Sequence, residues 1–298
     1  GAIIALWHDR LLASEENMIM ENNFYPSMLA LAERTWLGGG SQYYNGDGTM
    51  MWNEETETFK AFAEFEKRML WHKDKYFQGY PFGYVKQTHV KWNITDAFPN
   101  DGDMTKVFPP EQGLKDSYEY EGKQYGVRSA IGAGIYFRHV WGGLPTSIPT
   151  FYKDDKENHT AYAYTWVYSP KEQEVGMWAE TQNYSRSEMD LPPKQGTWDY
   201  RGSRLWINDE EIAPPTWTAT HTTKSNEIAL GNENCVARPP MMVTLKKGWN
   251  KVFWKLPIGK FRTNEVRLVK WMFTTVFVTP DGQKAVEGLV YSPDKKLK

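Results

Sequence analysis

The chain has 298 residues, of which 40% are hydrophobic and 24% charged, a composition typical of a globular protein rather than a disordered or membrane-embedded one. Its 35 basic and 37 acidic residues give a net charge of −2 without a basic stripe, so we expect no nucleic-acid partner. Aromatic residues are in excess, since 14 Trp, 17 Tyr and 14 Phe make up 15% of the chain. Such rings either fill a β-rich core or stack on sugar rings, and composition alone leaves both uses open.

The chain has a single cysteine, Cys235, so it forms no intrachain disulfide and no cysteine-based metal site. Its neighbours give no sign of the low-pKa setting that a thiol nucleophile needs, so we expect a buried or half-buried thiol. The six histidines show no metal-ligand spacing. We therefore expect no metal site and no cofactor.

The first apolar run occupies residues 2–7 (AIIALW). It is far shorter than the ~20 residues of a membrane-spanning helix, and it lacks the basic segment of a signal peptide, so we expect no membrane span. The run predicts a short, fully buried strand. Because the chain opens inside a hydrophobic element, we expect it to be a fragment of a longer protein.

Two helices are expected in the first 80 residues. Pro26 stands in the first turn of an apolar-periodic segment that runs to Trp36, and the glycines at 38–40 are expected to end it. A second helix is expected at about 56–76, where apolar side chains recur at helical spacing. These side chains are Phe59, Phe62, Phe65, Met69 and Leu70.

From Gly79 onward, short β-type runs are separated by turn residues. The strands that we expect are 161–168, 173–179, 204–207, 243–245, 251–256 and 271–279, and the turns are 208–209, 247–250 and 280–282. This pattern predicts a β-sandwich or jelly roll, so we divide the chain into residues 1–79 and a sandwich domain at 80–298. Two long loops, 185–198 and 214–232, are where a binding site is expected on such a fold.

Alternation in the expected strands sorts their side chains between two faces. It puts Trp254 on one face with Val252 and Leu256, which we expect to be the core face. It turns Trp206 away from its two apolar neighbours, so that ring is either exposed or packed in the core or against a loop.

Two acidic motifs are better interpreted as turns than as functional sites. The Asp-Glu-Glu motif at 209–211 follows directly on a strand, which favours a surface turn. The Asp-Gly-Asp motif at 101–103 could suggest a calcium loop, but the rest of an EF-hand pattern is missing, so we expect a turn there too.

The most specific motifs in the chain lie at residues 3–9 (IIALWHD) and 25–36 (YPSMLALAERTW). Together they resemble the last strand and last helix of the (β/α)8 catalytic barrel of family 20 glycoside hydrolases, the β-N-acetylhexosaminidases. That family typically shows a strand ending in Trp-x-Glu and then a Pro-Arg-x-x-Ala-x-Ala-Glu-x-x-Trp helix. The helix matches well, whereas Asp9 stands where the family has Glu and the Gly-Gly-Glu lead-in is absent. The resemblance covers about residues 2–38, and 39–298 look like the C-terminal extension of bacterial relatives.

This resemblance implies roles for two residues. Side chains at the carboxyl end of a barrel strand face the active site. By resemblance, Trp7 is a wall of the sugar pocket and Asp9 accepts hydrogen bonds from sugar hydroxyls, both only within an intact barrel. The family's catalytic Asp-Glu pair lies on strand four and works with the acetamido group of the substrate as nucleophile. That strand would lie upstream of Gly1, so we expect no catalytic residue here and no activity from this chain alone.

A second resemblance covers about residues 91–280, which look like the galactose-binding-like jelly rolls appended to many carbohydrate enzymes. The matching motifs are 92–94 (WNI), 108–111 (FPPE), 161–164 (AYAY), 205–208 (LWIN) and 247–256 (KGWNKVFWKL). The expected fold is therefore mainly β with an N-terminal α segment. It is a galactose-binding-like jelly-roll β-sandwich, preceded by the last β/α unit of a (β/α)8 barrel and one further helix.

Together the two resemblances imply the C-terminal accessory part of a periplasmic or secreted β-N-acetylhexosaminidase-like enzyme, which meets N-acetylhexosamine glycans through its parent enzyme. Two alternatives stay open, namely a carbohydrate-binding module and a structural domain that only packs on the barrel. The structural alternative predicts that aromatic rings on the sandwich surface are covered by residues 41–80. Without neighbouring barrel strands, residues 2–12 must refold, lose order or self-associate with a second copy.

Overall fold

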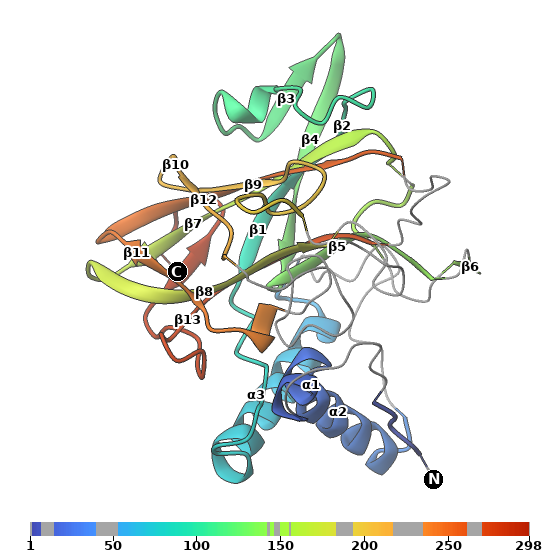
Figure 1. Cartoon of the computed structure of the whole chain (residues 1–298), viewed down its shortest axis with the longest axis vertical. Coiled ribbons are helices and arrows are strands. Elements are labelled where there is room, and N and C mark those ends of the chain that lie inside the picture. The colour runs from blue at the N-terminus through green and yellow to red at the C-terminus, as the bar shows by residue number, and fades with distance from the viewer. Residues whose placement is uncertain are drawn as a thin grey trace.

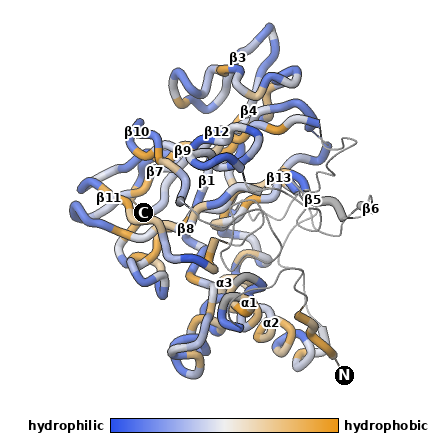
Figure 2. The backbone as a smooth tube through the Cα atoms, in the orientation of Figure 1, coloured by the Kyte–Doolittle hydropathy of each residue, from blue (hydrophilic) through white to orange (hydrophobic). Residues whose placement is uncertain are grey.

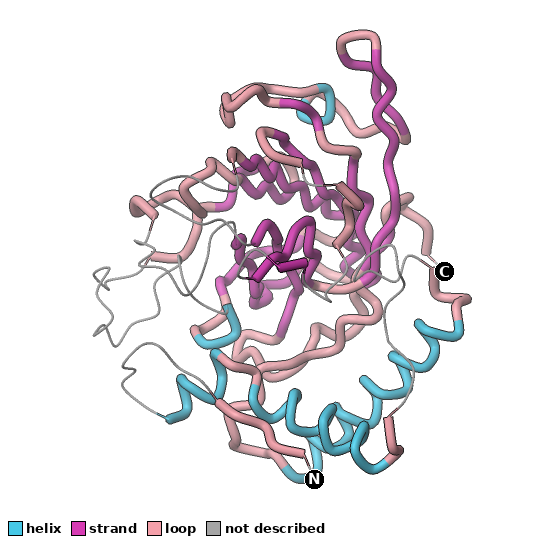
Figure 3. Tube along the Cα trace, turned by 90° about the vertical axis from the view of Figure 1, so that its right-hand side faces the viewer, coloured by secondary structure: helices cyan, strands magenta, loops and turns pink. Residues whose placement is uncertain are grey.

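The computed structural model describes residues 2–6, 15–39, 53–141, 144–145, 150–154, 156–182, 193–216, 235–260 and 270–297. Helices gather at one end of the molecule, beside two stacked β-sheets, and a long β-hairpin extends at the opposite end (Figures 1 and 3). The protein is therefore mainly β with an N-terminal α segment, as the sequence predicts. The division at residue 79 stays a prediction.

The helical segment confirms both predicted helices. It contains α1 (Glu15–Glu21), α2 (Phe24–Trp36) and α3 (Glu57–Tyr76). The Thr56 hydroxyl accepts a hydrogen bond from the Phe59 N–H at 3.2 Å and caps α3. Gly38, at φ +70°, ends α2 in a Schellman turn in which the Gly39 N–H donates to the Arg34 carbonyl at 2.8 Å. The sequence analysis did not predict α1, whose seven residues are too few to show a helical period.

All the strands pair antiparallel in two sheets. The larger sheet contains β1 (Lys91–Thr95), β2 (Phe98–Pro99), β3 (Ser117–Tyr120), β4 (Lys123–Ile131), β7 (His159–Ser169), β9 (Arg204–Ile207), β10 (Glu210–Ile212), β12 (Gly248–Ile258) and β14 (Val290–Ser292). Its order is β10–β9–β12–β7–β1–β4–β3, and β2 and β14 also pair with β7. The smaller sheet contains β5 (Gly134–Trp141), β6 (Leu144–Pro145), β8 (Gln173–Gln182), β11 (Met241–Leu245) and β13 (Lys270–Val278), in the order β11–β8–β13–β5–β6.

The six predicted strands are confirmed as β7, β8, β9, β11, β12 and β13. The turn at Asn208 and Asp209 is also confirmed, with both residues at positive φ. The turn predicted at 247–250 is wrong, because β12 already begins at Gly248, which adopts φ +96°. The sequence analysis did not predict β4 and β5, whose sequences KQYGVRSAI and GIYFRHVW mix polar residues into both faces.

The main core lies between the two sheets. Trp254, Val252 and Leu256 point into it and are fully buried, so the predicted alternation of β12 is confirmed. Trp92 of the larger sheet meets Phe273 of the smaller one with 5.1 Å between ring centroids. Much of the aromatic excess therefore fills the sandwich, and Cys235 is buried beside it as predicted.

A second aromatic cluster, which we name the outer cluster, packs on the opposite face of the larger sheet. Its buried members are Phe98, Phe108, Tyr118, Tyr125, Tyr162, Tyr164 and Phe253. The half-buried Trp206 packs against this cluster, so its ring is neither in the main core nor fully exposed. The covering rings come from residues 98–125, whereas the structural alternative predicted cover from residues 41–80, of which 53–80 are described. The described part of 41–80 instead packs with Phe82 against the helices.

The helices are joined to the sandwich by two buried charged side chains of α3. The Lys73 ammonium donates to the carbonyl oxygens of Tyr84 and Gln283 at 2.8 and 2.7 Å. The Glu66 carboxylate accepts from the Tyr84 hydroxyl at 2.7 Å and from the Thr88 hydroxyl at 2.5 Å. Tyr84 and Thr88 lie between α3 and β1, and Gln283 lies between β13 and β14. The contacts therefore hold α3 in a fixed position beside the sheets.

The first residues of the chain differ from the expectation. Residues 2–6 form no strand, and Ile3 is 93% exposed, so the prediction of a fully buried strand at 2–7 is wrong over the described part. A lone strand has no partner for its backbone hydrogen bonds, which explains why this sequence does not adopt one here. Residues 2–6 thus do not form the predicted strand, while the helix predicted after it is present as α2.

Candidate functional site

The two site residues that the sequence analysis assigned, Trp7 and Asp9, lie outside the described residues. The described residues instead hold a pocket of about 880 Å³ on the sandwich. Three segments line it, within 102–105, 196–204 and 211–214, together with Lys255 of β12. The second and third segments adjoin the long loops 185–198 and 214–232, where the sequence analysis expected a binding site.

One wall of the pocket is a turn at residues 102–105, which is anchored by the preceding Asn100. The Asn100 amide is fully buried and donates to the Thr160 hydroxyl and the Ile258 carbonyl, both at 3.2 Å. Asp103 accepts from the Thr105 hydroxyl at 2.6 Å and from its N–H at 2.9 Å, and these bonds lower the pKa of Asp103. The Asp-Gly-Asp motif is thus a turn as predicted, and the described residues contain no cluster of potential metal ligands.

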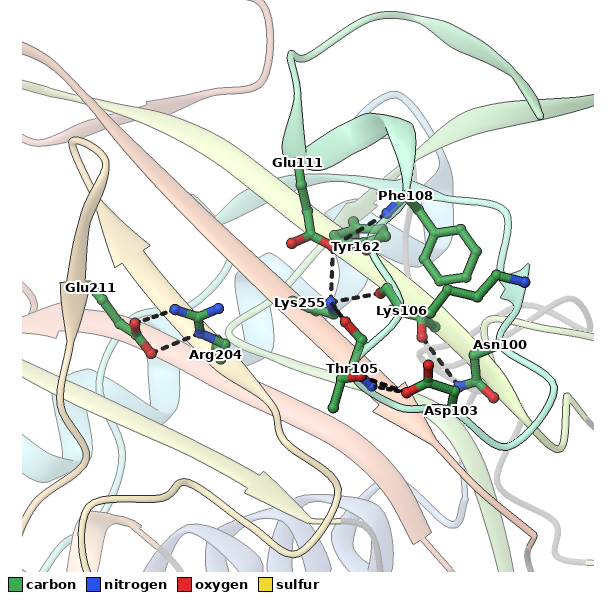
Figure 4. Close-up of polar contacts among 11 residues, drawn as sticks. Asn100, Asp103, Thr105, Lys106, Phe108, Glu111, Tyr162, Arg204, Glu211 and Lys255 are labelled. Carbon is green, nitrogen blue, oxygen red and sulfur yellow. Dashed lines mark hydrogen bonds and ion pairs between the residues drawn. The ribbon is translucent and has the colours of Figure 1, made fainter.

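A buried ion pair lies beside this wall (Figure 4). Lys255, only 3% exposed, lies 2.9 Å from Glu111 and donates to the Lys106 carbonyl at 2.8 Å. The Tyr162 hydroxyl donates to the same Glu111 oxygen at 2.5 Å. Burial and the charge of Glu111 raise the pKa of the Tyr162 phenol, which therefore stays protonated at neutral pH. Glu111 balances the charge of Lys255, whose ammonium also donates to the Lys106 carbonyl. Lys255 therefore lines the pocket without offering a free charge to a ligand.

A second ion pair crosses the β9–β10 hairpin at the rim (Figure 4). The Arg204 guanidinium donates one hydrogen bond to each carboxylate oxygen of Glu211 (Figure 4). These bonds lower the pKa of Glu211. The Arg204 guanidinium also lies 4.7 Å from the Trp206 ring centroid. In the Asp-Glu-Glu motif, Asp209 lies in the predicted turn, while Glu210 and Glu211 begin β10.

The segment 196–204 forms the opposite wall and is held by two buried side chains. Asp199 accepts from the Thr181 hydroxyl at 2.9 Å and from the N–H groups of Arg201 and Ser203 at 2.8 and 3.1 Å. Trp198 packs on the ring of Trp254 at 5.0 Å. With these two side chains turned inward, Tyr200 and Arg201 line the pocket.

Tyr200 and Arg201 give the pocket its ligand-binding potential. The Tyr200 side chain is 49% exposed and offers a flat aromatic surface. Arg201 is half-buried, and within the described part of the chain its guanidinium makes no hydrogen bond or ion pair. Burial lowers the pKa of Arg201, although the charge of Asp199 acts in the opposite direction. The sequence offered no signal for Arg201, because nothing in its local pattern distinguishes it from a solvated arginine.

A different surface lies at the helical end. Of the thirteen residues of α2, only Pro26 is buried. Trp36 is 90% exposed and Leu37 follows it with most of its side chain in solvent. Figure 2 shows hydrophobic stretches beside hydrophilic ones along α2. The exposed residues of α2 are Ser27, Ala32, Thr35 and Trp36, and we name them, together with Leu37, the α2 face.

Comparisons with known proteins add little. No family model matches the chain, and no curated protein matches it. The A domain of epithelial adhesin 9 from Candida glabrata is structurally similar in complexes with Galb1-4GlcNAc and Galb1-3GlcNAc, at 12% and 11% identity and TM-scores of 0.30 and 0.28. Each match covers 72% of this chain and 98% or 99% of the adhesin domain. At these TM-scores the two structures are only loosely alike. Among the described residues, no helix has the length and apolar character needed to cross a bilayer.

Proposed function

We propose that this chain is the C-terminal accessory part of a β-N-acetylhexosaminidase-like glycoside hydrolase of family 20. The observation that carries the proposal is the α2 face: the helix whose sequence resembles the last barrel helix of that family has only Pro26 buried. Most of its apolar side chains are half-buried and Trp36 is 90% exposed, and exposed apolar surface can mark a place where another surface packs. The remaining units of a (β/α)8 barrel are the occupant that this resemblance implies.

The packing of α2 and α3 supports an accessory role. One side of α2 already contacts α3, where Leu29 and Ala30 lie against the cluster of Phe65 and Met69. The Arg68 guanidinium of α3 donates to both carboxylate oxygens of Glu33 in α2, at 2.8 and 2.9 Å. Because α3 is in turn joined to the sheets, a barrel that packed on the α2 face would hold the sandwich in a defined position.

The proposal includes Trp7 and Asp9 as substrate-binding residues that act only within the complete barrel. It also includes N-acetylhexosamine glycans as the substrate of the parent enzyme, a periplasmic or secreted location, and a jelly-roll topology for the sandwich. This chain on its own then lacks the catalytic pair, so it does not hydrolyse glycosides.

The test is hydrolysis of an aryl N-acetyl-β-glucosaminide. We expect no hydrolysis above background from the purified 298-residue chain, and activity from the polypeptide encoded by the complete reading frame. Hydrolysis by the 298 residues alone would contradict the proposal, as would an upstream reading frame that encodes no further barrel strands.

A second candidate function is carbohydrate binding by the sandwich itself. The observation that favours it is the pocket of about 880 Å³ with the half-exposed Tyr200 ring at its wall. A flat ring beside polar groups is the arrangement by which proteins hold the apolar face of a sugar. Calorimetric titration with a panel of glycans tests this candidate, and a complete lack of binding would remove it.

A further inference from the structure

We propose that the pocket is selective for an acidic sugar, whose carboxylate is bound by the guanidinium of Arg201. This inference rests on the second candidate function and names the class of ligand for that pocket. It depends on the charges around the pocket, on the position of Arg201 and on the ring of Tyr200.

Three basic side chains line the pocket, and two of them form ion pairs with a carboxylate. Arg204 is bound by Glu211, and Lys255 by Glu111. The Asp103 carboxylate accepts hydrogen bonds from Thr105 and makes no hydrogen bond or ion pair with Arg201. An acidic ligand therefore meets one cation in the pocket whose charge is not already neutralised by a carboxylate in direct contact.

That cation is Arg201, whose surroundings favour a bound anion. Its guanidinium makes no hydrogen bond or ion pair with any described residue, and burial lowers its pKa. The carboxylate of Asp199 raises that pKa from a distance, but its oxygens already accept from Thr181, Ser203 and the backbone of Arg201. A partly dehydrated guanidinium without an acceptor gains more from a carboxylate than a solvated one does.

A carboxylate is, with phosphate, one of the two kinds of anion whose shape matches a guanidinium. A planar guanidinium donates two parallel hydrogen bonds to a planar carboxylate, which adds geometric selectivity to the charge. Tyr200, the residue that precedes Arg201, lines the same pocket and offers a ring for the apolar face of the sugar. A hexuronic acid carries both features, a pyranose face and a carboxylate, on a single ring.

Gly259 provides a way to move the guanidinium without removing its charge. A Cβ atom at Gly259 would lie 2.9 Å from Nη1 of Arg201, closer than such contacts allow. The contact is with the far end of a flexible side chain, so Gly259→Ala is expected to displace the guanidinium and leave the fold intact. This variant separates a specific hydrogen-bonded site from a general attraction of anions to a positive charge.

The experiment is calorimetric titration of the full 298-residue chain with methyl β-D-glucuronide, methyl β-D-glucoside and methyl β-D-glucoside 6-sulfate. We expect the glucuronide to bind at least about tenfold more tightly than the other two, the factor expected for charge-assisted hydrogen bonds. Arg201→Gln and Gly259→Ala should each reduce glucuronide binding to the level of the glucoside. Lys60→Gln, which removes an exposed charge from α3 at the other end of the molecule, should change nothing.

Each other result would overturn a stated part of the inference. Equal binding of glucuronide and glucoside would leave the sugar site standing and remove its selectivity for acids. Tighter binding of the sulfate ester would contradict the carboxylate assignment, and unchanged glucuronide binding by Gly259→Ala would contradict the hydrogen-bonded geometry. Binding of none of the three sugars would overturn this inference and would count against the sugar-binding function on which it rests. Unfolding temperatures of all variants within a few degrees of the wild type show that the fold is retained.

Discussion

The two ends of the molecule differ in how far their aromatic rings are covered and their buried lysines are paired. At the end that carries the outer cluster, aromatic rings are covered by the chain's own segment 98–125, and the buried Lys255 has a carboxylate partner in Glu111. At the helical end, Trp36 lies in solvent, and the buried Lys73 contacts two carbonyl oxygens without a carboxylate in salt-bridge contact among the described residues. The first end is covered by the chain's own residues, whereas the second leaves an aromatic ring in solvent and a buried ammonium without a carboxylate in contact.

The largest effect should come from breaking the completed end at Glu111. Glu111→Ala leaves the Lys255 ammonium buried without a counter-charge, and removing one partner of a buried ion pair typically costs about 3–5 kcal/mol of stability. The free energy of unfolding, measured by urea titration, should fall by that amount.

The exposed pair at the rim is the matched control for that variant. Glu211→Ala removes a carboxylate from Arg204, and both side chains are roughly half exposed, so the loss should stay below about 1 kcal/mol. A double variant that replaces the buried pair, Glu111→Leu with Lys255→Met, should recover most of the loss. Equal losses for Glu111→Ala and Glu211→Ala would contradict the distinction between the two pairs.

A smaller effect is expected at the helical end, where burial lowers the pKa of Lys73 to about 8 from its ordinary value of 10.5. Between these two values the unfolded chain binds more protons at Lys73 than the folded chain does, so stability rises with pH. Relative to Lys73→Met, which does not titrate there, wild-type stability should rise by about 1 kcal/mol per pH unit from pH 8 toward 10.5.

This pH dependence is measured as the difference between the two unfolding free energies at each pH, so that other titrating groups cancel. The difference should be flat below pH 7, where Lys73 is protonated in both states. A difference that stays flat up to pH 10.5, or that falls with pH, would show that Lys73 does not carry an uncompensated charge in the helical junction.

Local sequence patterns predicted the sandwich better than its functional surfaces. The alternation that placed Trp254 and the helical spacing that placed Phe65 depend on neighbours along the chain, so the sequence alone reveals them. The pairing of Lys255 with Glu111 joins residues far apart in the sequence, and no local pattern encodes it. Arg201 is distinguished only by the walls around it, which depend on how the segments before β9 and after β10 fold back.

The expectations that failed did so for a similar reason. The apolar run at the start of the chain has the sequence of a buried strand, but a strand also needs neighbours for its backbone hydrogen bonds, and Ile3 is exposed here. The structural alternative predicted that residues 41–80 cover the surface rings, whereas the covering rings of the outer cluster come from residues 98–125. In both cases the missing information was which segments meet in space.

The smallest effect on stability should come from Trp36→Ser on the α2 face. The ring is 90% exposed, so its removal should change the free energy of unfolding of this chain by less than about 0.5 kcal/mol. If the α2 face packs on the rest of a barrel, the same variant in the complete polypeptide should lower the unfolding temperature and the hydrolytic activity, because a large apolar ring is then buried at a junction. Trp71→Ser on α3 is the matched control, since that ring is half exposed and packs against His72 and Tyr76 of its own helix. If Trp36→Ser changes neither the unfolding temperature nor the activity of the complete polypeptide, the α2 face is not where the barrel packs. The difference between the two ends would then not reflect a docking surface.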